Sequence, residues 1–284
     1  GDAMKAPAAI IFSDLDGTLL DHEDYRFDAA APALAAVRAA DIPLILTTSK
    51  TLAEIAEINQ ALENPRPAIV ENGGALCFPL AHASPFLPPD HEVIDGYAVV
   101  RLAAPYGVVR DFIQRQRSAH RWQLRGFGDM TASEVAELTG LDLAAAARAR
   151  QRLCAEPFLW LDDRARYERL REEASAARLR ITRGGRFHHL MGQTSKAEGM
   201  RRMRALLAAD TAQAPLVIAL GDSENDTEML QNADIAVVIR RPDGTHLAVH
   251  GIRQTLFTEQ PGPAGWNAAV LQILHETGIG PAET

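Results

Sequence analysis

Short, uninterrupted apolar runs separated by helical stretches are the sequence feature that most restricts the fold. Five such runs occupy residues 8–13, 42–47, 68–70, 216–220 and 235–239. Continuous apolar runs of this length are typical of strands that are buried on both faces of a parallel sheet. The stretches between them, such as residues 52–62, place apolar residues at helical spacing. Strands that alternate with helices predict a doubly wound α/β fold.

The middle of the chain has a different pattern, which predicts an inserted unit. A cluster of prolines marks a loop at its start: Pro79, Pro85, Pro88 and Pro89. Predicted strands follow at 97–103, 122–127, 158–161, 179–182 and 185–190, with helices at 108–119, 131–140, 143–153 and 163–177. The parallel-sheet pattern resumes after Lys196. We therefore expect a discontinuous sheet domain, residues 1–83 and 191–284, and an α+β cap over residues 84–190.

The composition excludes several classes of protein. The chain has 29 Lys+Arg against 37 Asp+Glu, a net charge of −8 and a pI of about 5.6. This balance argues against general nucleic-acid binding, which needs a basic surface. Hydrophobic residues make up 47%, enough for a sizeable core, and no apolar run approaches the ~20 residues of a membrane span.

The N-terminal residues lack a signal-peptide pattern. The two cysteines, Cys77 and Cys154, are too few for a disulfide framework, and they suit a reducing compartment. We therefore expect a cytoplasmic monomer or homodimer that acts on a small molecule, without a nucleic-acid or membrane partner.

Two acidic loops follow two of the predicted buried strands. Asp14-Leu-Asp-Gly-Thr comes directly after the first strand, and Gly221-Asp-Ser-Glu-Asn-Asp follows the strand at 216–220. The carboxyl ends of parallel strands meet at the ligand-binding edge of an open α/β sheet. If the two strands are neighbours, four carboxylates crowd one pocket and need a cation there: Asp14, Asp16, Asp222 and Asp226. Oxygen ligands select a hard ion, so we expect Mg²⁺.

Two further elements suit an anionic ligand at the same edge. Residues 47–50, Thr-Thr-Ser-Lys, end the second strand, and their small hydroxyls can donate to an anionic oxygen. Lys196 opens the predicted helix at 197–207 and can hold negative charge from the opposite side. Helix N-termini themselves favour anions. These residues indicate a site for an anionic ligand beside a metal ion.

Four motifs in this order make the sequence resemble the haloacid dehalogenase superfamily of phosphatases. They are Asp14-x-Asp-Gly-Thr, the strand-ending Thr48, Lys196, and Gly221-Asp-x-x-Asn-Asp, and they bracket nearly the whole chain. The insert lies between the second and third motifs, where the type IIB subgroup carries a large α/β cap. Within that subgroup the sequence is similar to mannosyl-3-phosphoglycerate phosphatases. The similar segments are spread through core and cap: residues 48–51, 71–75, 126–131, 156–158, 184–188 and 261–266.

The resemblance implies a role for each motif residue. Asp14 is expected to attack phosphorus and form an aspartyl-phosphate. Asp16 is expected to protonate the departing oxygen and then to activate water, while its backbone carbonyl binds Mg²⁺. Asp222 is expected to be a third protein ligand, and Asp226 to act through water or by orienting the other ligands. Stabilisation of the transferring phosphoryl group is expected from Thr48, Lys196 and the backbone N–H groups near Leu15 and Ser49.

A second group of residues is expected to contact the substrate: Ser49, Glu71, Asn72, Gly73, Gly74, Arg186, His188 and Asn225. Asn-Gly and Gly-Gly are also strong turn signals, so residues 71–74 either form a tight turn or donate to the substrate. Arg186 and His188, two residues apart on a predicted strand, would share one face, whereas the adjacent His189 would face the other way. On that face they would bind a glycerate carboxylate or a sugar hydroxyl; the alternative is a solvated strand.

Other basic residues compete for roles in the site. Lys50 is an alternative to Lys196, and we assign it instead to the start of the following helix. Arg148, Arg150 and Arg152 alternate along a predicted helix and do not share a face. We expect one of them to point into the pocket and the others to be solvated.

The resemblance implies Mg²⁺-dependent hydrolysis of mannosyl-3-phosphoglycerate to mannosylglycerate, a compatible solute, and phosphate. The glucosyl ester, another sugar phosphate and a phosphonate are alternatives, and phosphomutase activity is a further one. Dehalogenation is disfavoured, because Asp16 suits an oxygen leaving group. A non-catalytic regulator that binds phosphorylated sugars is the alternative from a different class.

Overall fold

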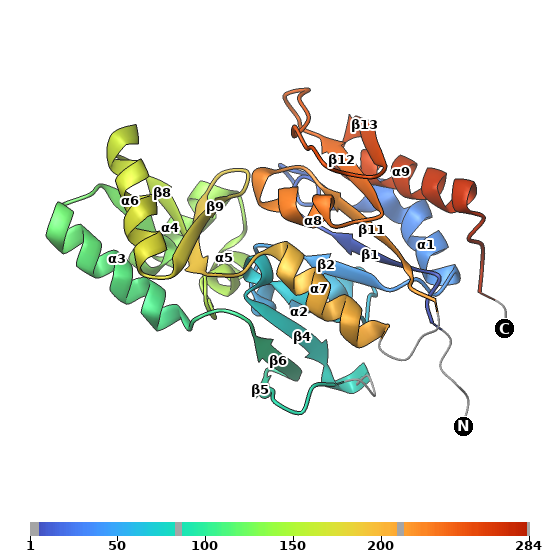
Figure 1. Ribbon diagram of the computed structural model, residues 1–284, viewed down its shortest axis with the longest axis horizontal. Helices are drawn as coiled ribbons and strands as arrows, with labels where there is room; N and C mark the ends of the chain where they lie inside the picture. The colour runs from blue at the N-terminus through green and yellow to red at the C-terminus, as the bar shows by residue number, and fades with distance from the viewer. Residues whose placement is uncertain (1–5, 83–86, 209–212, 283–284) are drawn as a thin grey trace.

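A nine-stranded sheet and the helices that cover it form the larger part of the molecule (Figure 1). The computed structural model describes residues 6–82, 87–208 and 213–282. The strand order is β13-β12-β11-β1-β2-β3-β4-β6-β5, with parallel pairs from β13 to β3 and antiparallel pairs from β3 to β5. The strands are β1 (Ala9–Ser13), β2 (Leu44–Thr47), β3 (Ala68–Val70), β4 (Ala75–Pro79), β5 (Glu92–Ile94), β6 (Tyr97–Arg101), β11 (Leu216–Gly221), β12 (Ile235–Arg240) and β13 (Thr255–Pro261).

The predicted apolar runs form the centre of this sheet. Every residue of β1 is buried, as are those of β2. β1 pairs in parallel with β11 on one side and with β2 on the other. Ser13 lies opposite Leu220, so the two acidic loops leave neighbouring strands at the same edge. The predicted doubly wound α/β core is therefore confirmed, together with the adjacency on which the acidic cluster depends.

Helices cover both faces of the large sheet. α1 (Ala31–Ala39), α2 (Leu52–Ala61) and α9 (Gly262–Thr277) contribute to one hydrophobic cluster, which includes Ile11 of β1. α7 (Lys196–Leu207) and α8 (Thr227–Gln231) contribute to the cluster on the opposite face, which includes Ile10. Alternate residues of β1 thus point to opposite helical layers, which explains its uninterrupted apolar sequence. Across the described ranges, we find no helix with both the length and the apolar character needed to cross a membrane.

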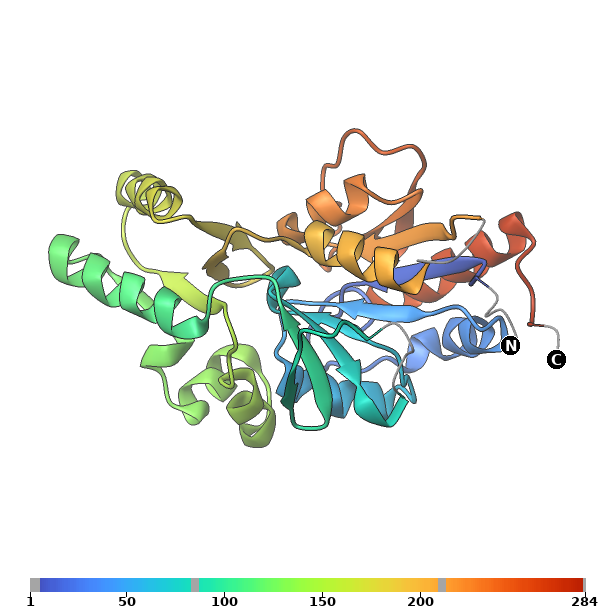
Figure 2. The same cartoon turned by 60° about the horizontal axis from the view of Figure 1, so that its bottom comes forward.

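A four-stranded antiparallel sheet lies at the left in Figure 1 and belongs to the inserted α+β unit. Its strand order is β7-β8-β10-β9, where the strands are β7 (Leu124–Gly126), β8 (Glu156–Trp160), β9 (Leu179–Arg183) and β10 (His188–Gly192). α3 (Tyr106–His120) and α6 (Arg164–Ala176) pack on this sheet in one hydrophobic cluster. α4 (Ala132–Thr139) and α5 (Leu143–Ala149) form a second cluster with the short helix η4 (Phe127–Asp129). Figure 2 shows this unit extending away from the large sheet.

The large sheet extends beyond the predicted boundary at residue 84. β6 pairs with β4, and β5 pairs with β6, so the segment that follows the proline-rich loop still belongs to the large sheet. That loop joins two strands at the sheet edge instead of linking two domains. The small sheet also continues to Gly192, past the predicted end at 190. The chain therefore leaves the large sheet after Arg101 and rejoins the core at α7.

Candidate active site

Three buried carboxylates meet where β1 and β11 end. The backbone N–H of Asp14 donates to the carbonyl of Leu220 at 3.0 Å, which fixes the first acidic loop against β11. One carboxylate oxygen from each of Asp14, Asp222 and Asp226 lies within 4.8 Å of the other two. Burial and the neighbouring Asp226 carboxylate raise the pKa of Asp14 well above its ordinary range, and the same causes raise the pKa of Asp222. The predicted crowding is present for these three aspartates.

Lys196 holds two of these carboxylates from the N-terminus of α7. Its Nζ lies 3.0 Å from Oδ1 of Asp14 and 2.7 Å from Oδ1 of Asp226. The lysine is buried, which disfavours its charged form, but the two carboxylates outweigh burial and raise its pKa. Lys196 is therefore a buried ammonium group in direct contact with Asp14, at the position predicted from the sequence.

Asp226 orients the cluster and does not line the cleft. Its Oδ2 accepts hydrogen bonds from the backbone N–H groups of Asp222, at 3.0 Å, and Ser223, at 3.1 Å, while its Oδ1 contacts Lys196. Gly221 is required beside it, because an added Cβ would lie 2.6 Å from the Asp226 side chain. Both oxygens of Asp226 are thus engaged by protein donors, whereas Asp14 and Asp222 line the cleft.

Asp222 is fixed from two sides. Thr18 donates from its hydroxyl to Oδ1 at 3.0 Å, and Ser223 donates to Oδ2 at 3.2 Å. Gly17 has a φ of +75°, and a Cβ there would lie 2.7 Å from Oδ2 of Asp222. The glycine of the first motif therefore serves both the left-handed turn and the close approach of the second acidic loop.

Asp16 lies in the same cleft but contacts a different lysine. Its side chain is 42% exposed, and its Oδ2 lies 3.3 Å from Nζ of Lys50. Lys50 is buried and also lies 3.2 Å from Oε2 of Glu54; both carboxylates outweigh burial and raise the pKa of Lys50. The assignment of Lys50 to a helix start alone was incomplete, because Lys50 lines the cleft. The i, i+4 pairing of Lys50 with Glu54 was the sequence signal for this position.

The loop after β2 supplies Thr48 and Ser49. Thr48 is buried, and its hydroxyl accepts a hydrogen bond from the backbone N–H of Lys50 at 3.0 Å. Ser49 lines the cleft together with Lys50. The loop is anchored to β3, because the N–H of Thr48 donates to the carbonyl of Ile69 at 3.0 Å. The second motif therefore lies beside Asp14 and Asp16, as expected.

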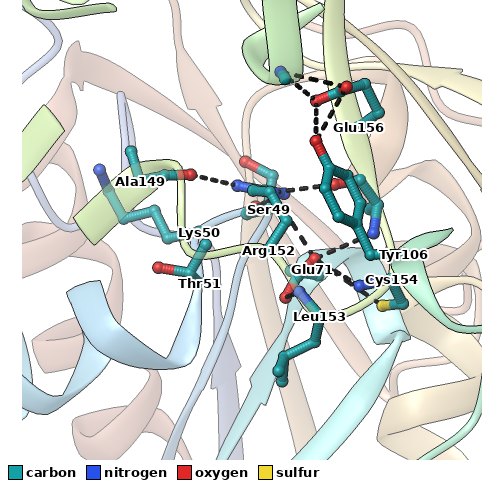
Figure 3. A network of polar contacts seen from close by, with 12 residues as sticks. Ser49, Lys50, Thr51, Glu71, Tyr106, Ala149, Arg152, Leu153, Cys154 and Glu156 are labelled. Atoms are coloured by element: carbon teal, nitrogen blue, oxygen red, sulfur yellow. Dashed lines mark hydrogen bonds and ion pairs between the residues drawn. The ribbon is translucent and has the colours of Figure 1, made fainter. Parts of the chain in front are cut away.

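The segment from Glu71 to Gly74 joins the core to the inserted unit instead of lining the cleft (Figure 3). Glu71 is fully buried, and its carboxylate accepts from three successive backbone N–H groups, those of Leu153, Cys154 and Ala155, at 2.8 to 3.0 Å. Of the two interpretations of residues 71–74, the structural one fits Glu71. This carboxylate is occupied by the chain itself.

The glycines of the same segment allow close backbone contacts. Gly73 has a φ of +89°, and an added Cβ would lie 1.9 Å from the carbonyl oxygen of Ser195, just before Lys196. A Cβ at Gly74 would lie 2.1 Å from Sγ of Cys154. Gly73 and Gly74 therefore pack against α7 and the inserted unit and do not line the cleft, and their contact with a substrate stays a prediction.

Asn72 and Asn225 form a pair at the back of the cleft. Nδ2 of Asn225 donates to Oδ1 of Asn72 at 3.0 Å, and Asn225 lines the cleft. Asn72 lies behind it, on a second cavity that Asn225 and Lys196 also line. Two residues that were predicted separately to contact the substrate are therefore brought together, with Asn225 on the cleft side.

Arg152 is the one of the three alternating arginines that lines the cleft. Its side chain is 2% exposed and joins the two parts of the molecule (Figure 3). It donates to the carbonyl of Ser49 at 3.1 Å in the core and to the carbonyls of Ala155 and Ala149 at 2.8 and 3.3 Å in the insert. Its Nε lies 3.6 Å from Oε1 of Glu71. Arg152 therefore ties the loop that carries Ser49 to the inserted unit.

The predicted pairing of Arg186 with His188 on one strand face is wrong. Arg186 lies in the turn between β9 and β10, where alternation along a strand does not apply, and it lines the cleft. His188 faces the other side: its Nδ1 lies 2.9 Å from the hydroxyl of Tyr167, and its ring stacks on Phe158. The adjacent His189 lines the cleft instead.

The insert also gives the cleft an apolar wall opposite the charged floor of the core. Its members are Phe127, Leu141, Ala149, Pro157 and Phe187. The rings of Phe127 and Phe187 meet edge to face with centroids 5.1 Å apart. The cleft thus presents carboxylates and Lys50 of the core together with apolar groups and Arg186 of the insert.

Known proteins resemble this chain along nearly its whole length. The family of haloacid dehalogenase-like hydrolases matches residues 11–82 and 158–243. A glucosyl-3-phosphoglycerate/mannosyl-3-phosphoglycerate phosphatase from Persephonella marina is 37% identical over 268 residues, which covers 94% of this chain and 97% of the relative. A phosphatase of the same name from Methanococcoides burtonii is 38% identical over 265 residues, which covers 93% of this chain and 97% of the relative. The solved structure of a subclass IIB sugar phosphatase matches with a TM-score of 0.62 and 14% sequence identity. The match covers 95% of this chain and 99% of the other chain, which shows that the two share a fold.

Proposed function

Because this chain belongs to the haloacid dehalogenase-like hydrolases, we propose that it is the phosphatase that removes phosphate from a glycosyl-3-phosphoglycerate. The observation that carries the proposal is the contact of Lys196 with Asp14, at 3.0 Å, beside Asp222. It gives a carboxylate nucleophile next to a buried cation, which suits attack on a phosphate ester. Both relatives carry the glucosyl and the mannosyl ester in their names. We take the mannosyl ester as the first substrate and the glucosyl ester as the second.

The acidic cluster fits a divalent cation. Its donors are carboxylate oxygens alone, and the pKa values of Asp14 and Asp222 are raised by burial and by the Asp226 carboxylate. A hard cation removes this repulsion and favours both ionised forms. Asp14, Asp222 and the backbone carbonyl of Asp16 would hold Mg²⁺, which supplies positive charge to the phosphate oxygens. Asp226, engaged by Lys196 and two N–H groups, orients the ligands.

The chemistry is divided between two aspartates. An oxygen of Asp14 attacks phosphorus and forms an aspartyl-phosphate, while the ester oxygen leaves and takes a proton from Asp16. Asp16 then removes a proton from water as that water attacks the phosphorus, which releases phosphate and regenerates Asp14. Lys196 holds Oδ1 of Asp14 during both steps. The hydroxyl of Thr48 and the backbone of Ser49 stabilise the phosphoryl oxygens.

Residues 102–195 act as the cap, and the rest of the chain forms the catalytic core. The cap wall carries Arg186, which we assign to the carboxylate or a hydroxyl of the bound ester, and apolar residues that contact the sugar. Closure of such a cap excludes water from the aspartyl-phosphate. Two buried free cysteines, Cys77 and Cys154, suit a reducing cytoplasm.

Phosphate release tests the proposal. The substrates are mannosyl-3-phosphoglycerate, glucosyl-3-phosphoglycerate, 3-phosphoglycerate and p-nitrophenyl phosphate, each with Mg²⁺ and with chelator. We expect the highest kcat/KM for a glycosyl ester and activity only with the metal. A preference for an unrelated sugar phosphate would overturn the substrate assignment. Tight binding of the esters without turnover would instead favour a regulator.

A further inference from the structure

His189 occupies an unusual position in the cleft. It lies on β10, opposite Pro157 and Thr182 in the small sheet, and the residue is only 5% exposed. Although buried, it lines the same cleft as Asp14 and Asp16. Its neighbour His188 points the other way, to Tyr167. The inserted unit thus places one imidazole over the charged floor of the core.

Polar atoms without partners occur on this imidazole and on the asparagine pair of the core. Within the described part of the chain, we find no hydrogen-bond partner for Nδ1 of His189, for Oδ1 of Asn225 or for Nδ2 of Asn72. Asn225 lines the same cleft as His189. Buried polar groups are nearly always hydrogen-bonded, so such atoms at a cleft point to a bound polar ligand.

Gly184 leaves the space that such a ligand needs. Its φ is not left-handed, so the turn itself does not require glycine. An added Cβ would lie 3.0 Å from Nε2 of His189 and 3.8 Å from Nδ2 of Asn225. The glycine therefore keeps open the space between a histidine of the cap and an asparagine of the core.

The surroundings determine what the imidazole can bind. Burial, with the positive charges of Arg152 and Lys196, lowers the pKa of His189 to about 3. A neutral imidazole carries one donor and one acceptor nitrogen. The positive charges of Arg152 and Lys196 favour a negatively charged oxygen of a ligand as the partner of the donor nitrogen. Lys196, whose charge acts on His189, also contacts Asp14, and His189 and Asp14 line the same cleft. Arg186, by contrast, is exposed at the turn.

We propose that His189 is a specificity-determining residue that hydrogen-bonds to the glyceryl portion of the substrate, the three-carbon acid esterified to the phosphate. The inference rests on the proposed function and extends it, because it assigns the glyceryl group to His189 and leaves the sugar, with a hydroxyl for Arg186, to the outer cap wall. The glyceryl carboxylate provides the oxygen acceptor that the positive charges of Arg152 and Lys196 favour, and the side chain of Asn225 completes the subsite from the core.

The test compares variants on three substrates that add one part at a time. These are p-nitrophenyl phosphate, 3-phosphoglycerate and the glycosyl-3-phosphoglycerate. We expect His189→Leu to lower kcat/KM by about tenfold or more on both phosphoglycerates, by the same factor, and to change p-nitrophenyl phosphate hydrolysis by less than about twofold. His189→Gln, which keeps a donor and an acceptor, should recover part of the loss. His188→Gln, the matched control that faces away from the cleft, should change none of the three.

Other patterns would overturn the assignment. Equal losses of kcat/KM on all three substrates would mean that His189 acts in the fold or at the phosphate. A loss on the glycosyl ester alone would mean that His189 contacts the sugar. No loss on any substrate would mean that His189 does not contact the substrate. A binding experiment tests whether His189 contacts the glyceryl group, even if wild-type turnover contradicts the proposed function. In ¹⁵N spectra of Asp14→Asn, the His189 ring nitrogens should shift with 3-phosphoglycerate and not with inorganic phosphate alone. Identical shifts with both would contradict the glyceryl contact.

Discussion

Replacing Glu71 with glutamine tests the idea that this residue fastens the inserted unit to the core. In the native protein its carboxylate accepts from three backbone N–H groups and lies 3.6 Å from Nε of Arg152. The amide oxygen of glutamine can replace Oε1, which accepts from Cys154 and Ala155. Its NH₂ group then faces the N–H of Leu153, so two donors meet where a donor met an acceptor.

The expected loss follows from these contacts. A buried N–H group without an acceptor costs about 1–3 kcal/mol, and hydrogen bonds to a charged group are stronger than neutral ones. The largely buried side chain of Arg152 also loses its carboxylate partner. We therefore expect Glu71→Gln to lower the free energy of unfolding by about 2–4 kcal/mol.

Urea denaturation followed by circular dichroism measures this change, and hydrogen exchange at Leu153, Cys154 and Ala155 locates it. The matched control is Glu57→Gln on the exposed face of α2, which should stay within about 0.5 kcal/mol of wild type. A loss below about 1 kcal/mol for Glu71→Gln, or unchanged exchange at the three amides, would refute the reasoning.

Further predictions concern catalysis, metal and pH. Asp14→Asn should lower phosphate release from every substrate by more than about 1000-fold with the circular dichroism spectrum retained; activity near wild type would exclude a covalent role. Chelation should abolish turnover and Mg²⁺ should restore it, whereas Ca²⁺ should compete without supporting turnover; full activity in chelator would remove the metal assignment. Arg186→Ala should lower kcat/KM for the glycosyl ester by about tenfold, or ~1.4 kcal/mol, and leave p-nitrophenyl phosphate nearly unchanged; equal losses would contradict a specificity role. The folded pKa of His189 is lowered from 6.5 to about 3, so the unfolded chain binds the extra proton and stability should fall as pH falls from about 6.5. His189→Gln should make this dependence shallower by about 1.4 kcal/mol per pH unit in urea titrations.

The centre of the fold was predictable because its strands are buried on both faces. β1 and β11 read as apolar runs, and their acidic loops follow directly. β13 gave no such signal, since most of its residues are exposed or partly exposed at the edge of the sheet. The hairpin of β5 and β6 was assigned to the insert because proline-rich loops resemble linkers. Only its pairing with β4, a contact between segments separated in sequence, places it in the large sheet.

In the candidate site, too, some residues were predictable from local sequence patterns and others were not. Asp14, Asp222 and Lys196 were predictable, because each stands at the end of a strand or the start of a helix. His189 was not, because an error of one residue in the strand register exchanges the face that meets the cleft with the face that meets Tyr167. The position of Arg152 likewise depends on a loop of the insert that folds against Glu71, which short-range patterns do not encode.

The contacts of Arg152 with Ser49 and Glu71 limit how far this protein can be treated as interchangeable modules. A cap transplanted onto this core from another sugar phosphatase would bring its own segment in place of residues 150–155. Glu71 would then be left as a buried carboxylate without its donors, and the loop carrying Ser49 would lose its clamp. A graft that changes substrate choice therefore has to include residues 150–155 together with the cap. The alternative is to replace single residues of the cap wall and to leave the contacts of Glu71 and Arg152 intact.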